Sequence, residues 1–271
     1  MQVYRGLDIG TAKPTAAERA AVPHHVVDVA DPTEEWSAVR HQAAARAAVA
    51  GIAARGKRAL LVGGTGLYVQ AVVDDLRFPQ EDPDLRAELE AWTAEPGGVA
   101  AAYDELRTRD PAAAGKVDPH NARRIVRALE VIRLTGQPFS SFGPGVDHFG
   151  PTAFPVRMIG IWLARDVLNT RIGARFAAMR DAGLVDEVRR LVAGPPLSRT
   201  AAQAIGYKEV IAALNDAEGS LDDAIETAVR RTRSFGRRQR MWFRRDPRIT
   251  WLGAPDNPCD VLPALLATWT S

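Results

Sequence analysis

The sequence predicts an α/β protein in which a parallel-sheet core is interrupted by a helical insertion. In the core, the short apolar run 59–62 is followed by the turn 63–66 and then by a helical pattern, which is the strand–turn–helix unit of a doubly wound sheet. From residue 82 the pattern changes to amphipathic helices. We therefore expect residues 1–81 and 154–271 to form the α/β core with its C-terminal helices, and residues 82–153 to form the insertion.

The elements of the core follow from local patterns. The β-branched run 26–29 and the apolar run 59–62 predict strands, the second because it is too short for a helix and is bounded by glycine. A capping Asp31, a proline in the first turn and Glu34 indicate the start of a helix, and the alanine-rich stretch 37–55 is helical. Further helices are predicted at 167–181, 184–192, 200–214 and 221–244, and further strands at 158–163 and 249–252.

Within the insertion, amphipathic patterns predict helices at 84–93, 99–109 and 121–134. The third helix ends at Thr135-Gly136-Gln137-Pro138, where glycine and proline prevent its continuation. A stretch rich in Gly, Pro and Ser, residues 136–155, then leads back to the core.

The composition is that of an ordinary globular protein, with 46% hydrophobic and 25% charged residues. The single cysteine, Cys259, excludes an internal disulfide and favours a reducing cytoplasm. No apolar run reaches the roughly 18 residues of a membrane span. The five histidines lack the spacing of metal ligands. We expect a cytoplasmic monomer without membrane association and without metal-ligating side chains.

Positive charge is concentrated near the C-terminus. Residues 230–271 contain 9 Lys and Arg against 3 Asp and Glu, although the whole chain carries a net charge of only +2. Residues 230–245 contain eight of these arginines, interleaved with Phe235, Trp242 and Phe243. Arginine offers bidentate contacts to phosphate and a planar face for stacking on bases. The pattern favours a polyanionic partner, while the aromatic side chains individually fit a packing role.

Two further segments could bind anions. Gly63-Gly64-Thr65-Gly66 precedes a helix, so Thr65 and the following N–H groups lie where negative charge is favoured; a tight turn without a ligand is the alternative. In the helix 121–134, Arg123, Arg124 and Arg127 form a cationic cluster, for which a solvated face is the alternative.

The first fourteen residues form a compact, glycine-containing segment. Gly6 and Gly10 allow the backbone to approach a ligand closely. Lys13-Pro14 then supplies a cation and a rigid turn.

Four segments, in the same order along the chain, resemble the tRNA dimethylallyltransferase (tRNA isopentenyltransferase) family. These segments are 1–14, 61–68, 204–209 and 237–244. The family also has an N-terminal phosphate-binding loop and an Asp-Ser pair, which would lie just before Met1, and no G-x-x-x-x-G-K-[ST] motif occurs in this sequence. The resemblance implies a P-loop-NTPase-like, nucleotide-binding parallel sheet that is N-terminally incomplete.

The resemblance implies transfer of a dimethylallyl group from dimethylallyl diphosphate to N6 of an adenine next to the tRNA anticodon. It implies the tRNA anticodon stem-loop as partner and Mg²⁺ as cofactor. Because the P-loop and the general-base Asp are absent, we expect low activity and low stability of the chain as written. Two alternatives remain open, a non-catalytic RNA-binding remnant and a P-loop-type small-molecule kinase.

The resemblance also implies roles for individual residues. Thr65 is the catalytic candidate. The expected tRNA contacts are Met1, Gln2, Arg86, Arg123, Arg124, Arg127, Arg237, Arg238, Gln239, Arg240, Trp242 and Arg244. The region of the prenyl diphosphate and tRNA comprises Gln203, Gly206, Tyr207 and Lys208.

Overall fold

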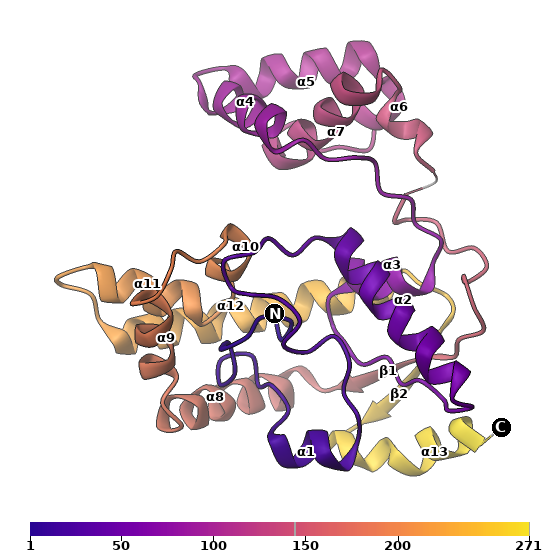
Figure 1. Cartoon of the computed structure of the whole chain (residues 1–271), viewed down its shortest axis with the longest axis vertical. Helices are drawn as coiled ribbons and strands as arrows, with labels where there is room; N and C mark the ends of the chain where they lie inside the picture. The colour runs from indigo at the N-terminus through magenta and orange to yellow at the C-terminus, as the bar shows by residue number, and fades with distance from the viewer. Residues whose placement is uncertain (144, 271) are drawn as a thin grey trace. The chain divides into compact units, whose positions relative to one another are not determined.

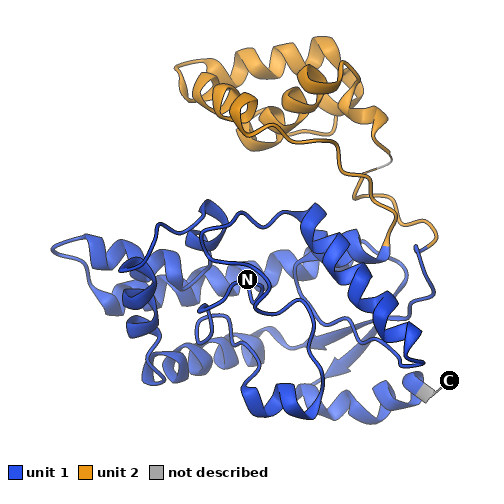
Figure 2. Ribbon diagram, in the orientation of Figure 1, with its two compact units in different colours: residues 1–73, 152–271 blue, residues 74–151 orange. Residues whose placement is uncertain are grey.

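The computed structural model describes residues 1–143 and 145–270, and it divides the chain into two compact units (Figures 1 and 2). Unit 1 comprises Met1–Val73 and Thr152–Ser271, and unit 2 comprises Asp74–Pro151. The boundaries expected from sequence were 82 and 153, so the structure assigns eight residues more at the N-terminal side to unit 2. Hydrogen bonds tie two of these eight residues to unit 2, because Arg127 donates to the carbonyls of Pro79 and Gln80.

Unit 1 contains a two-stranded parallel sheet of β1 (Met158–Leu163) and β2 (Ile249–Ala254). Their register runs from Met158 opposite Ile249 to Leu163 opposite Ala254. Both strands were expected, and they make the fold class mixed α/β. The connection between them is helical: α8 (Arg165–Asp181), α9 (Leu184–Val192), α10 (Arg199–Ala202), α11 (Tyr207–Asn215) and α12 (Leu221–Phe243).

The strands expected at 26–29 and 59–62 are absent from the described structure. In the first segment, Val26 and Asp28 have positive φ angles of 61° and 56°, which no strand allows. Only an isolated parallel bridge between Tyr4 and Ala30 forms nearby. In the second segment, Leu60 and Val62 are 67% and 81% exposed. A strand requires a neighbouring strand for its backbone hydrogen bonds, and neither run acquires one.

Two helix boundaries also differ from expectation. Helix α2 (Ala38–Ala54) is capped by Ser37, because the Asp31 carboxylate instead closes a local turn by accepting from the N–H of Thr33. The predicted helix 200–214 is broken between α10 and α11, where Gly206 adopts a φ of 95°. The short helix α1 (Ala16–Ala21), which begins with a capping box of Thr15 and Glu18, was not predicted.

The core of unit 1 joins segments that are far apart in the sequence. Tyr4 and Leu7 from the N-terminal segment are fully buried with Leu184 of α9 and Tyr207 of α11. Helix α3 (Gly66–Val73) is tied to α2, since Gln42 donates to the carbonyl of Ala71. The chain ends with η2 (Pro258–Val261) and α13 (Leu262–Thr270).

Among the described residues of unit 2, all regular secondary structure is helical. Its elements are α4 (Pro83–Ala94), α5 (Gly98–Arg109), α6 (Pro111–Ala114), α7 (Ala122–Thr135) and η1 (Phe139–Ser141). Leu89, Leu106, Ile125 and Leu129 are fully buried and form its own core. Across both units, no helix among the described residues is long and apolar enough to cross a membrane.

Candidate functional site

The turn that carries Thr65 lies against the C-terminal half of α12. Thr65 is exposed and directly precedes α3, with its carbonyl accepting from the N–H groups of Tyr68 and Val69. A Cβ added to Gly64 would lie 2.4 Å from Nε2 of Gln239, and one added to Gly66 would lie 2.2 Å from Cδ1 of Trp242. The structure therefore brings the catalytic candidate together with two expected tRNA contacts.

Four expected tRNA-binding arginines, three in α12 and one at its C-cap, fall into two groups. Arg237, Arg238 and Arg244 are exposed. Arg240 is instead partly buried: its guanidinium lies 3.9 Å from the centroid of the Trp162 ring and donates to the carbonyl of Leu163 at 2.7 Å. Arg240 thus binds the C-terminal end of β1, a role that its position in the sequence did not reveal.

A pocket of about 410 Å³ lies between α11 and α12. Its rim is cationic, with Lys208 from α11 and Arg231 and Arg238 from α12. The buried Glu209 offsets part of this charge, since it pairs with Arg231 and accepts from the N–H of Gly206 at 2.7 Å. The full lining is Gln203, Ile205, Lys208, Glu209, Arg231, Ser234 and Arg238.

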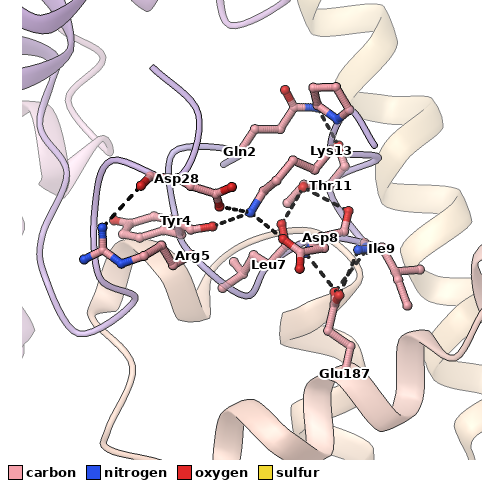
Figure 3. A network of polar contacts seen from close by, with 12 residues as sticks. Gln2, Tyr4, Arg5, Leu7, Asp8, Ile9, Thr11, Lys13, Asp28 and Glu187 are labelled. Atoms are coloured by element: carbon pink, nitrogen blue, oxygen red, sulfur yellow. Dashed lines mark hydrogen bonds and ion pairs between the residues drawn. The ribbon is translucent and has the colours of Figure 1, made fainter. Parts of the chain in front are cut away.

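The glycine-containing N-terminal segment binds an internal carboxylate, where the sequence had suggested an external ligand (Figure 3). Glu187 of α9 is 3% exposed and accepts from the N–H groups of Asp8, Ile9 and Gly10 at 3.1, 2.8 and 3.2 Å. Gly10 is required for space, because a Cβ there would lie 2.5 Å from the ring of Tyr207. The close approach that glycine permits is therefore made by α11.

Lys13 and Gln2 are likewise engaged within this segment (Figure 3). The ammonium of Lys13 contacts the carboxylates of Asp8 and Asp28, each at 2.5 Å, and its side chain is 2% exposed. The Gln2 amide donates to the carbonyls of Thr11 and Ala12 at 3.0 and 2.9 Å. Met1, another expected tRNA contact, is 43% exposed.

Tyr207 faces the interior of unit 1, whereas the sequence analysis placed it in the region of the prenyl diphosphate and tRNA. Its ring is fully buried and its hydroxyl donates to Glu187 at 2.5 Å. Burial, together with the adjacent carboxylate, raises the pKa of the Tyr207 hydroxyl far above its usual value, so the group remains a donor. Gly206 is buried as well, whereas Gln203 and Lys208 are exposed and joined by a 2.8 Å hydrogen bond.

In unit 2, a buried carboxylate separates the four expected tRNA-binding arginines into two pairs. Glu130 is 0% exposed and receives a bidentate contact from Arg86, at 3.0 and 2.9 Å, and a contact from Arg127 at 2.9 Å. Arg123 and Arg124, in the first turn of α7, are exposed. The latter two are accessible to a polyanion, while Arg86 and Arg127 stabilise the unit.

The electrostatics of this cluster favour the ionised carboxylate. Burial opposes the ionisation of Glu130, but hydrogen bonds from Arg127, the N–H of Asp82 and Arg86 outweigh it, so the pKa of Glu130 is lowered. A buried charge is tolerated only with such partners.

No site for the expected Mg²⁺ is found in the part of the chain that the structure describes. Among residues 1–143 and 145–270, no group of three His, Cys, Asp or Glu side chains could hold a metal ion. His41 stacks on Tyr68 with ring centroids 4.7 Å apart, and burial lowers its pKa. Mg²⁺ is usually bound by one or two carboxylates together with the phosphates of a substrate, so the absence of such a group among the described residues concerns only sites built from side chains alone.

The sequence analysis missed Glu187, Glu130 and Trp162. A signal existed for the two carboxylates, because each lies among apolar residues in the sequence of its helix: Glu187 precedes Val188 and follows Leu184 by three residues, and Glu130 lies between Leu129 and Val131. A lone acid on a buried helix face indicates an internal cation or a set of N–H donors. Trp162 had no such signal, since an aromatic residue in a strand is ordinary.

Comparisons with known proteins point to the same family as the resemblance seen in the sequence. A family model described as IPP transferase matches residues 2–246. A relative from Kineococcus radiotolerans, called tRNA dimethylallyltransferase, is 52% identical over 264 residues, which cover 96% of this chain and 81% of the relative. A relative of the same name from Streptomyces coelicolor is 49% identical over 253 residues, with 93% and 79% covered.

The solved structures that this chain resembles are also transferases that act on tRNA. The full-length tRNA isopentenylpyrophosphate transferase from Bacillus halodurans has a TM-score of 0.68 and 40% identity, covering 99% of this chain and 84% of that protein. A eukaryotic dimethylallyltransferase acting on tRNA has a TM-score of 0.74 and 26% identity, covering 100% of this chain and 67% of that protein.

Proposed function

Because the chain belongs to the IPP transferase family, we propose that it transfers a dimethylallyl group from dimethylallyl diphosphate to N6 of an adenine next to the tRNA anticodon. The observation that carries this proposal is the contact of the Thr65 turn with Gln239 and Trp242. It joins a helix N-terminus, which suits the leaving diphosphate, to a basic helix, which suits the RNA.

The chemistry is a displacement at an allylic carbon, during which negative charge develops on the departing oxygen. The exposed hydroxyl of Thr65 and the N–H groups at the start of α3 are donors suited to that charge. The exposed Arg237, Arg238 and Arg244 would hold phosphates of the RNA. Bases in an anticodon loop are already unpaired, so they can reach such a site at low cost.

The proposal includes the anticodon stem-loop and dimethylallyl diphosphate as partners of a cytoplasmic monomer. Mg²⁺ is proposed as the companion of the diphosphate, and no ligands in this chain are assigned to it. We also propose that the sheet is of the P-loop type, which the parallel pairing of β1 and β2 with helical connections supports.

The test is a transfer assay with the full chain, unmodified tRNA, dimethylallyl diphosphate and Mg²⁺, in which prenylated adenosine is detected by mass spectrometry. We expect prenylation at a single adenine beside the anticodon. The Kineococcus relative, called tRNA dimethylallyltransferase, is assayed alongside as the positive control. Binding of tRNA without any transfer would favour the RNA-binding alternative, and the absence of both would refute the proposal.

A small-molecule kinase gains no support from the relatives described above, which are called tRNA prenyl transferases. A small-molecule kinase also binds no RNA, so it would leave the exposed arginines at the C-terminal end of α12 without the partner proposed for them. Transfer of phosphate from ATP to a small acceptor, in the absence of prenyl transfer, would revive that alternative.

A further inference from the structure

We propose that Glu187 is a positioning residue for RNA binding, which acts through Tyr207 to orient Lys208 at the rim of the pocket between α11 and α12. The inference rests on the proposed function, because it takes this cationic pocket to bind phosphate groups of the tRNA. Glu187 itself touches no substrate in this proposal, since it is buried behind the segment 8–10.

The first step is the saturation of the Glu187 carboxylate. One oxygen accepts from the N–H groups of Asp8 and Ile9 (Figure 3), and the other accepts from the N–H of Gly10 and from the Tyr207 hydroxyl. Four donors match the capacity of an ionised carboxylate. Hydrogen bonds to a charged acceptor are stronger than neutral ones, so the side chain holds all four donors in one arrangement.

The second step leads from Glu187 into α11. Tyr207 is the first residue of this helix, and its ring is fixed on one side by its hydrogen bond and on the other by the contact with Gly10. The preceding Gly206 has a φ of 95°, so the backbone turns sharply into the helix. The hydrogen bond of Tyr207 to Glu187 is thus one of the contacts that fix the first turn of α11, beside the bond from the Gly206 N–H to Glu209.

The third step concerns Lys208, the next residue of the same turn. Tyr207 is buried and Lys208 is exposed beside the pocket, and the two residues share one turn of backbone, so a displacement of the backbone at Tyr207 would also displace the lysine. The Lys208 ammonium is bonded to the neutral amide of Gln203, which leaves its charge available to a phosphate. Arg231, on the same rim, is paired with Glu209, which makes Lys208 the stronger electrostatic contributor.

The experiment is a double-mutant cycle on tRNA binding, with Glu187→Gln, Lys208→Ala and the double variant, measured over a range of salt concentrations. We expect Glu187→Gln to weaken binding about tenfold. A plot of the logarithm of the binding constant against the logarithm of the salt concentration has a slope, here called the log–log salt slope. Glu187→Gln should also lower the magnitude of this slope by about 0.7, as the loss of one phosphate contact does. Lys208→Ala should have the same two effects, and the double variant should bind no more weakly than Lys208→Ala alone.

Asp186→Asn is the matched control, because it changes the neighbouring, exposed carboxylate of the same helix. It should leave affinity within about twofold of the unmodified protein and the salt slope unchanged. Tyr207→Phe keeps the ring but removes the hydrogen bond to Glu187, so it replaces Glu187→Gln in the cycle if that variant does not fold. Circular dichroism establishes the folding of each variant.

The proposal would be overturned if the losses of affinity from Glu187→Gln and Lys208→Ala multiplied in the double variant while Glu187→Gln left the salt slope unchanged. That result would mean that Glu187 only stabilises the fold. Failure of the unmodified protein to bind tRNA is a different result. It would refute the proposed function, and with it any role of Glu187 in RNA binding.

Discussion

Gly66 and Trp242 are packed so closely that a methyl group on Gly66 would lie 2.2 Å from Cδ1 of the indole. The contact joins the start of α3 to the last turn of α12, two elements that are separated in sequence by all of unit 2 and by residues 152–220 of unit 1. The Gly66 φ angle is not in the left-handed region, so space alone accounts for glycine at this position.

Gly66→Ala should therefore displace the indole of Trp242. We expect a loss of about 1–3 kcal/mol in the free energy of unfolding, as overpacking typically produces. Gly63→Ala is the control, since its Cβ would lie 3.6 Å from Cγ2 of Val69, an ordinary contact, and its effect should stay within about 0.5 kcal/mol. Urea denaturation of both variants measures the difference, and equal stabilities would contradict the packing argument.

Thr65→Val should separate catalysis from binding. The substitution keeps the side-chain volume but removes the hydroxyl, so we expect kcat for prenyl transfer to fall about 10²–10³-fold. The affinity for tRNA should change by less than about twofold, because Thr65 is one neutral contact among many charged ones. Thr65→Ser retains the hydroxyl and should retain most of the rate. A Thr65→Val variant with unaltered kcat would remove Thr65 from the catalytic machinery.

The two groups of arginines on α12 should respond differently to alanine. Arg237→Ala, Arg238→Ala and Arg244→Ala should each reduce the log–log salt slope of tRNA binding by about 0.7–0.9. Arg240→Ala should instead lower thermal stability, because Arg240 stacks on Trp162 and binds the Leu163 carbonyl. The exposed Arg189 of α9, replaced by alanine, serves as control for net charge. Identical slopes for all variants would mean that α12 does not contact RNA.

Glu130 should make the stability of unit 2 depend on pH. The pKa of Glu130 is lower in the folded protein than in the unfolded chain, where it is about 4.3. The ionised carboxylate therefore stabilises the folded state fully above the unfolded pKa, and this stabilisation is lost as the pH falls through the lower, folded pKa. The midpoint of thermal unfolding should therefore be nearly constant between about pH 5 and 7 and fall in more acidic buffers.

Glu130→Gln should weaken this acid dependence, and at neutral pH it should cost about 3–5 kcal/mol, because Arg86 and Arg127 would lose their buried partner. Glu88→Gln is the matched control, since that carboxylate is exposed and pairs with Arg133 at 3.5 Å. The control should change stability by less than about 1 kcal/mol. An acid transition of unchanged size in Glu130→Gln would show that other carboxylates govern it.

Much of the secondary structure could be predicted from the sequence, because it depends on neighbours in the chain. The strand 158–163 was predicted with the bounds of β1, and the helices 184–192 and 121–134 correspond to α9 and to α7 within one residue at each end. Periodicity and capping residues act over one or two turns, and they are visible without knowledge of the fold. The family was evident in the same way, from four short segments in a constant order.

The sites of the two internal carboxylates could not be predicted, because their partners are remote. Glu187 and Ile9 are 178 positions apart, yet they form a 2.8 Å hydrogen bond. For the same reason, the interpretation of the segment 1–14 as a compact loop that approaches a ligand did not identify Glu187 as the acceptor of its N–H groups. A glycine in a compact loop indicates close approach, but only the tertiary structure decides what approaches.

The runs 26–29 and 59–62 show the same division between local and global information. Both have the composition of strands, but a strand exists only if a second strand satisfies its N–H and C=O groups. The sequence by itself determined most of the longer helices, the β1 strand and the family of this protein. The tertiary structure alone decided which runs pair, which arginines remain exposed, and which donors surround Glu187, since each of these depends on hydrogen bonds and burial between distant residues.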